Sequence, residues 1–265
     1  MKKQTKKIIF TSVLSVSILT GAVLILNQSI SEAPRESQLV DKSGQKKVKT
    51  FYKKEVKNIL GDLKYSNYPD DFQGLIASGD MTILGTVMNL ESYVYSPYGN
   101  DGPSNPFTMA TIRIDKVLAG TSNDKTVKVL FPGGNISKKA LLVDVATKEW
   151  LTKEEREDAV SEEVITVKES YSPLPQLGES MALILGEAPH GANNIDETYY
   201  MASFAGKGVF LNNDGTYERE PEVKTTGNGE SAATGLRTAR SANVVTDTDD
   251  EIMNKGMNDL VDAKS

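Results

Sequence analysis

Alternating apolar and polar positions dominate the middle of the chain and predict β-strands from about residue 80. In residues 81–87 (MTILGTV), Met81, Ile83 and Val87 share one face of a strand, and residues 88–95 continue it. Gly85 interrupts this strand, as a glycine often does where a strand bends sharply in a small closed barrel. The pattern therefore predicts a barrel that begins with a long, bent strand.

Further strands follow at short intervals. Residues 107–120 and 125–131 alternate well and are joined by the turn TSND at 121–124, which predicts a hairpin that ends at Pro132-Gly133-Gly134. Residues 164–168 form another candidate strand, and the apolar run 181–185 predicts a fully buried one. Asp214-Gly215 is a hairpin turn signal between two more apolar stretches.

Helical spacing occurs outside and between these strands. Apolar residues in 51–64 predict a helical lead-in over residues 51–69, and the segment DFQGLIASG (71–79) predicts a short helix. Thr152 and Glu155 stand at the spacing of a capping box at the start of a charged surface helix. Residues 249–262 predict a weak amphipathic helix within a polar tail, residues 221–265, which we expect to be mostly disordered.

The start of the chain has the pattern of an export segment. Residues 1–7 are basic, and residues 8–26 (IIFTSVLSVSILTGAVLIL) contain no charged residue. Nineteen uncharged residues suit a transmembrane signal anchor, and a cleaved signal peptide is the alternative. By the positive-inside rule the anchor leaves the C-terminus outside the cell, beyond a flexible spacer at 27–50. We thus expect a single-pass protein of the cell membrane, or a secreted protein if the signal is cleaved.

Composition narrows the possible chemistry. The net charge is −6, and the only charges before residue 27 are four lysines, so the remainder carries −10. An acidic domain argues against nucleic acid as a partner, because phosphate binding requires a concentrated basic surface. The chain has no cysteine, which excludes disulfides, thiolate metal sites, a cysteine nucleophile and a lipoprotein anchor.

Three strings resemble netrin-like domains: 77–87 (ASGDMTILGTV), 112–120 (IRIDKVLAG) and 177–185 (LGESMALIL). Netrin-like domains are the OB-type barrels of tissue inhibitors of metalloproteinases, and the same pattern resembles uncharacterised exported proteins of Gram-positive bacteria. The resemblance covers roughly residues 70–218 and implies a mainly β fold, a small OB-like barrel over 70–220 with peripheral helices. The family's disulfides and inhibitory cysteine have no counterpart here, so inhibition of metalloproteinases is not implied.

No catalytic or metal-binding constellation is evident in the sequence. His190 is the only histidine, and its neighbours Pro189 and Gly191 indicate an exposed turn. We therefore predict no cofactor and no enzymatic activity. The best candidates for ligand contact are the aromatic residues Tyr93, Tyr95 and Tyr98, because OB barrels bind ligands on their faces and loops; alternatively, they are core and loop residues.

These patterns predict an exported β-barrel module that acts by binding at the bacterial cell surface. Its partners would be the membrane, through residues 8–26, and an extracellular protein or another envelope component. Two alternatives stay open: a cell-envelope hydrolase that uses carboxylates, and a structural accessory protein without a ligand.

Overall fold

The computed structural model describes residues 50–59, 65–99, 102–143, 146, 148–221 and 248–265. The predicted export segment, residues 8–26, and all but the last residue of the predicted spacer, residues 27–50, lie outside these residues. No helix in the described part of the chain combines the length and the apolarity that crossing a bilayer requires.

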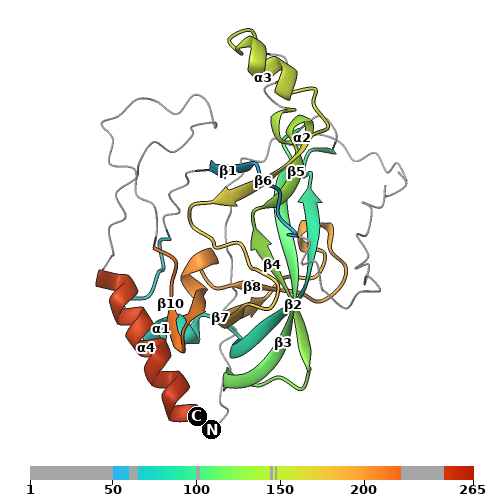
Figure 1. Ribbon diagram of the computed structural model, residues 1–265. Helices are drawn as coiled ribbons and strands as arrows, with labels where there is room; N and C mark the ends of the chain where they lie inside the picture. Colours follow the sequence, from blue (N-terminus) through green and yellow to red (C-terminus); the bar gives the residue numbers. More distant parts are fainter. Residues whose placement is uncertain (1–49, 60–64, 100–101, 144–145, 147, 222–247) are drawn as a thin grey trace, which may run out of the picture. The chain divides into compact units, whose positions relative to one another are not determined.

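The larger sheet has seven strands in the order β10-β9-β7-β2-β3-β4-β8 (Figure 1). Their bounds are β2 Met81–Tyr95, β3 Asn105–Gly120, β4 Thr126–Pro132, β7 Ser180–Glu187, β8 Tyr200–Ala202, β9 Val209–Asn213 and β10 Thr216–Glu218. All their pairings are antiparallel except the one between β4 and β8. The predicted mainly β fold is confirmed, as are the hairpins β3–β4 and β9–β10.

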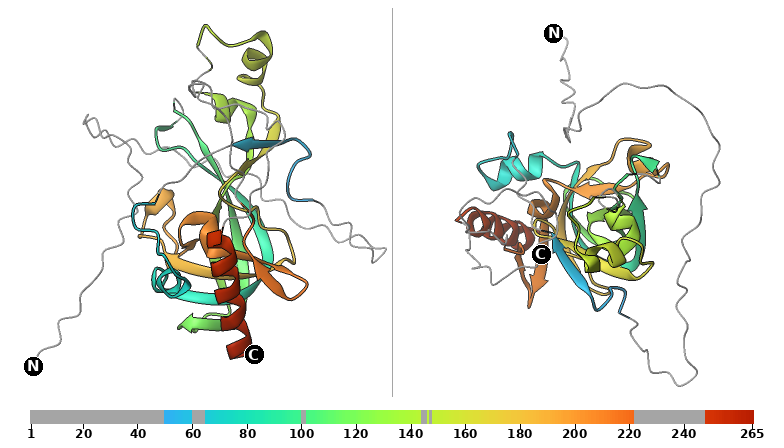
Figure 2. Two further views of the ribbon diagram at one scale, coloured as in Figure 1. Left: turned by 90° about the vertical axis from the view of Figure 1, so that its left-hand side faces the viewer. Right: turned by 90° about the horizontal axis from the view of Figure 1, so that it is seen from above.

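Five of these strands form a partial ring. β8 pairs with β7 and also, through Val129 and Tyr200, with β4, so the neighbours around the ring are β2, β3, β4, β8 and β7. The view from above in Figure 2 shows the strands curving into a ring, and an apolar core fills its interior. This core comprises Met81, Ile83, Val87, Leu90, Ala110, Ile112, Val127, Val129, Phe131, Met181, Leu183, Leu185 and Val209. Alternate positions of each strand point inward, as the period of the sequence requires.

Gly85 lies at an irregularity of β2, as predicted. The register with β3 shifts between Leu84 and Gly85. A Cβ added at Gly85 would stand 2.4 Å from the Ile112 Cγ2 atom and 2.9 Å from the Arg113 carbonyl oxygen. Only a residue without a side chain permits β2 and β3 to approach so closely at this bend.

The second sheet corrects one prediction. It has the order β1-β6-β5, with β1 at Val56–Ile59, β6 at Val164–Glu169 and β5 at Gly134–Ser137. The lead-in 51–69 was predicted to be helical, but its residues 56–59 form a strand and its other described residues are not helical. The reason is tertiary: β1 pairs in parallel with β6, more than a hundred residues later, and the local apolar spacing cannot reveal this partner.

The predicted short helices are present. α1 spans Phe72–Ala77, and the Gly74 amide donates to the Asp71 carboxylate at 2.7 Å, so Asp71 caps the helix. α3, also predicted, spans Lys153–Asp158, whereas α2, Lys138–Leu142, was not predicted. The Thr152–Glu155 capping box of α3 is confirmed, since each side chain accepts from the backbone amide of the other residue.

The C-terminal helix α4, Thr248–Lys264, is longer and more firmly packed than predicted. Its Met253 and Met257 side chains are 0% exposed and pack with Phe72, Leu75 and Phe210. The helix predicted at 249–262 is therefore present, but the disorder expected for the tail is wrong for residues 248–264, because two buried methionines join this helix to the core. The rest of that predicted tail, 222–247, lies outside the described residues.

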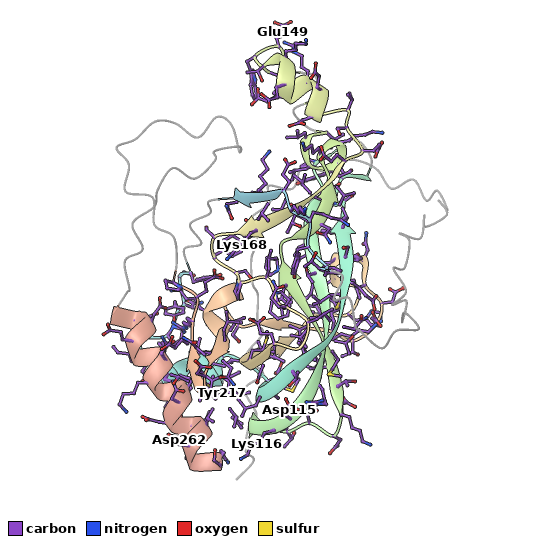
Figure 3. All side chains as sticks on the ribbon, viewed as in Figure 1. Asp115, Lys116, Glu149, Lys168, Tyr217 and Asp262 are labelled. Carbon is purple, nitrogen blue, oxygen red and sulfur yellow. The ribbon has the colours of Figure 1, made fainter. Side chains whose placement is uncertain are left out.

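Helix α4 also covers the edge of β10. The Tyr217 amide donates to Asn258 Oδ1 at 2.8 Å, the Arg219 amide donates to Asn254 Oδ1 at 3.0 Å, and Asn258 Nδ2 donates to the Tyr217 carbonyl at 2.9 Å. Figure 3 shows Tyr217 between this strand and the helix. Residues four apart on a helix are separated by about 6 Å along its axis, close to the two-residue repeat of a strand. The side chains of Asn254 and Asn258 can therefore bond to the backbone of β10 where a neighbouring strand would otherwise bond.

Candidate functional site

A groove of about 370 Å³ opens on the outer face of the ring. We call it the tyrosine groove. It lies between the second half of β2, the facing residues of β3 and the loop that joins β7 to β8. Its lining residues are Glu91, Ser92, Tyr93, Met109, Asn194, Ile195, Asp196 and Glu197.

The floor of the groove is apolar and well packed. Glu91 of β2 lies opposite Met109 of β3, and Tyr93 lies opposite Phe107. Because side chains alternate along a strand, these residues point away from the core inside the ring. Met109, Leu130, Ile195 and Tyr199 form a separate buried cluster with Tyr93 packed against it. The β7–β8 loop therefore forms a permanent wall over the outer face of β3 and β4.

Two tyrosine hydroxyls hold this loop in place. The Tyr93 hydroxyl donates to the Asn193 carbonyl. The Tyr199 hydroxyl donates to the Ala192 carbonyl at 3.0 Å and accepts from Asn193 Nδ2 at 2.9 Å. Asn193 and Asn194 both have left-handed backbones, with φ of 54° and 58°. Such residues cost about 1 kcal/mol or more each and persist only where their surroundings enforce them, which is typical of ligand sites.

The same tyrosines remain neutral donors at ordinary pH. Burial raises the pKa of Tyr93, and the nearby Tyr199 and Tyr95 hydroxyls raise it further. Burial also raises the pKa of Tyr199, and the hydrogen bond from Asn193 only partly opposes this rise. Both pKa values move away from neutrality, so the loop's anchoring bonds are insensitive to physiological changes of pH.

The rim of the groove is acidic. Glu91, Asp196 and Glu197 place three carboxylates there. Lys128 pairs with Glu197 at 2.5 Å, and Asn89 donates to Glu91 at 2.9 Å. Three carboxylates against one ammonium favour an uncharged or cationic ligand over an anionic one.

Of the three predicted contact residues, only Tyr93 lines the groove. Tyr95 is the last residue of β2 and is half-buried, close enough to Tyr93 to affect its pKa. Tyr98 is 57% exposed in the β2–β3 loop and lies against Gly102. The sequence reading missed residues 194–197, where the turn residues around His190 indicated only an exposed loop. Of the two tyrosines that hold this loop, Tyr199 lies within it, but Tyr93 lies 100 residues from Asn193 in the sequence.

The remaining ionisable groups do not converge on the groove. His190 is exposed in the β7–β8 loop. No group of three or more metal-binding side chains occurs among the described residues. Burial raises the pKa of Glu169 to about 7, and it also raises the pKa of Glu179, but neither residue lines the groove.

Glu169 predicts a pH dependence of stability. Its folded pKa lies above the ordinary 4.5, so it contributes stability below about pH 4.5 that is lost as the pH rises through about 7. At pH 8 the half-buried Glu169 is charged, whereas glutamine in its place is neutral. Glu169→Gln should therefore raise the free energy of unfolding at pH 8 by about 2 kcal/mol, a value reduced to allow for the partial exposure of the side chain. Urea unfolding from pH 4 to 8 measures this. Glu218→Gln, at an exposed position, is the control. If the stability of the Glu169→Gln protein changed with pH in the same way as that of the unsubstituted protein, Glu169 would not be the source of the pH dependence.

Comparison of the chain with family models, with curated proteins and with solved structures gave no match.

Proposed function

We propose that this protein is an exported module with an OB-type barrel that binds a basic peptide segment of an extracellular partner in the tyrosine groove. It acts by binding and not by catalysis. The observation that carries the proposal is the groove itself: an apolar floor, an acidic rim and a strained loop fixed by two tyrosine hydroxyl groups.

The order of the ring strands supports an OB-type barrel. The OB fold is a five-stranded, partly open Greek-key barrel that binds ligands on its second and third strands and with the loops after its first and fourth strands. Counted within the ring, β2 is the first strand, β3 the second and β7 the fourth. The tyrosine groove then lies on the first and second strands beside the loop after the fourth, and it shares the second strand and that loop with the ligand site of OB barrels. The resemblance of residues 70–218 to netrin-like domains agrees with this.

The proposal that the protein is exported rests on its sequence. The basic residues 1–7 and the uncharged run 8–26 favour a signal anchor that holds the domain outside the cell membrane, with a cleaved signal peptide as the alternative. An acidic surface of net charge −10 beyond residue 26 disfavours nucleic acid and favours partners with basic segments.

The basic side chain has a specific place to bind. Asp196 is exposed at the rim and has no ion-pair partner among the described residues, whereas Glu197 is already paired with Lys128. A Lys or Arg of the ligand can therefore pair with Asp196 and Glu91 while its neighbouring apolar residues contact Met109 and Ile195. Recognition of this kind weakens as salt concentration rises.

Photo-cross-linking on living cells tests the proposed function. A photoreactive amino acid at exposed Asn194 should give a defined adduct on intact cells, and the same group at exposed Glu218, outside the groove, should not. Tyr93→Ala should lower the adduct yield roughly tenfold, because it removes one wall of the groove and the anchor of Asn193. Tyr93→Phe should have a smaller effect, since the ring remains.

The controls separate loss of binding from loss of folding. Tyr217→Phe removes a hydroxyl remote from the groove and should leave the adduct yield unchanged. Asp196→Asn should lower the yield and its dependence on salt without changing the unfolding temperature. Equal adduct yields at positions 194 and 218, or full yield with Tyr93→Ala, would rule out the groove as the binding site.

A further inference from the structure

A small, partly open cavity of about 10 Å³ lies away from the tyrosine groove. It is formed by the loop after β6, the turn η3 (Ala205–Gly208) and the chain just after β10. Arg219, Lys207 and Ser172 contribute its polar donors, with Tyr171, Gly206 and Glu220 around them. A space of this size admits one water-sized species.

Arg219 is almost completely buried and only half satisfied. Its side chain is 1% exposed. Its Nη1 atom donates to Asp249 at 3.0 Å and to Asp250 at 3.1 Å. Its Nε and Nη2 atoms, which form the opposite edge of the guanidinium, have no hydrogen-bond partner within the described structure. A buried charged donor without an acceptor is costly, so this edge calls for an acceptor that the protein itself does not supply.

Ser172 adds a second unsatisfied donor to the same cavity. The residue is 4% exposed, and its hydroxyl also lacks a partner among the described groups. Tyr68 lies near enough for the Arg219 charge to oppose the burial-driven rise of the Tyr68 pKa. Its hydroxyl donates to Asp249 at 2.9 Å, and no hydrogen bond joins it to Nε or Nη2.

The walls of the cavity are rigid. Gly206 donates its amide to the Tyr171 carbonyl at 2.9 Å, and a Cβ at Gly206 would stand 2.1 Å from that oxygen. The two preceding residues, Phe204 and Ala205, both have left-handed backbones. Arg219 is also held over the Phe210 ring, 5.1 Å from its centre. The unsatisfied edge therefore cannot turn towards another acceptor of the protein.

The charge balance limits what can bind. Arg219 and Lys207 are matched by Asp249 and Asp250, because Lys207 also pairs with Asp250 at 3.3 Å. Glu220 is paired with Lys168, which Figure 3 labels on β6. A multivalent anion such as phosphate would leave a large uncompensated charge and would exceed the space. A single small monovalent anion adds only one charge to these balanced pairs and occupies the least space, so it is the anion that both limits oppose least.

We propose that this cavity binds one monovalent anion of the size of chloride, which accepts hydrogen bonds from Arg219 Nε and Nη2 and from Ser172 Oγ. The anion joins the loop after β6 to the residue that holds α4, so its binding stabilises the attachment of that helix. This site is independent of the tyrosine groove and of the function proposed for it.

Bromide provides a direct probe. Crystals of the full chain soaked in sodium bromide should show an anomalous peak within hydrogen-bond distance of Arg219 Nε and Nη2. In solution, the unfolding temperature should rise with sodium chloride and saturate, at constant ionic strength kept with sodium gluconate, whose anion is too large for the cavity. Ser172→Ala should weaken the apparent chloride affinity roughly tenfold.

Ser203→Ala is the matched control, because Ser203 is also buried with an unpartnered hydroxyl but does not line the cavity. It should leave the chloride dependence unchanged. Both variants remove only an unsatisfied hydroxyl, so the fold should survive in each. A water without anomalous signal in the cavity, or equal chloride dependence of the Ser172→Ala and unsubstituted proteins, would overturn the proposal.

Discussion

Gly256→Ala is expected to lower the free energy of unfolding by about 2–3 kcal/mol through overpacking. Within an isolated helix the same change is stabilising by about 1 kcal/mol. The sign reverses here because α4 packs closely on α1: a Cβ at Gly256 would lie 2.4 Å from Phe72 Cγ and 2.7 Å from Phe72 Cβ. Phe72 is buried and cannot turn away without disturbing the core. Urea unfolding followed by circular dichroism measures the change.

The neighbouring Lys255 provides the control for this prediction. It is exposed on the same turn of α4, so Lys255→Ala should change stability by less than about 0.5 kcal/mol. The double variant Gly256→Ala with Phe72→Leu should recover part of the loss, because the smaller side chain relieves the clash. Stabilisation by Gly256→Ala alone would show that α4 does not pack on Phe72 as described.

Asp250→Ala should be destabilising by about 3 kcal/mol, as is usual when one partner of a buried ion pair is removed. The Asp250 carboxylate accepts from both Arg219 and Lys207, and its own side chain is only 9% exposed. Without it, Arg219 retains Asp249 but loses half of its charge compensation in a buried place. Thermal and urea unfolding of the variant measure the loss.

A double variant distinguishes charge from packing at this site. Asp250→Ala combined with Arg219→Met should lose less stability than the sum of the two single changes, since no uncompensated charge remains. Asp262→Ala, at an exposed position of α4 labelled in Figure 3, should have almost no effect. Additive losses in the double variant would mean that Asp250 stabilises through packing alone.

The sequence predicted most strands of the larger sheet, either from alternating apolar positions or, for β7, from a continuous apolar run, but it did not predict the short strand β8. It predicted the bend of β2 from Gly85, which is also a local signal. It failed at β1, which pairs with β6 in the described part of the chain, because parallel pairing over a long separation has no local pattern. It identified the C-terminal helix but not its packing, which depends on the contact between Gly256 and Phe72, residues far apart in the chain.

The candidate site, too, could be predicted from the sequence only in part. Tyr93 could be chosen from the sequence as an aromatic residue near a strand end. The acidic loop that completes the groove could not, because its position is set by hydroxyl groups of Tyr93 and Tyr199 that bond to its backbone. Turn residues predict that a loop exists but do not predict the surface on which it lies.

The two asparagines of α4 that cover β10 also have a consequence for biosynthesis. Every strand emerges from the ribosome before residues 254 and 258, so the edge of β10 is open for as long as α4 is missing. An open edge recruits other strands and favours aggregation. We therefore expect stable folding only after the helix has emerged, and a chain stopped before residue 248 should depend on chaperones for its solubility.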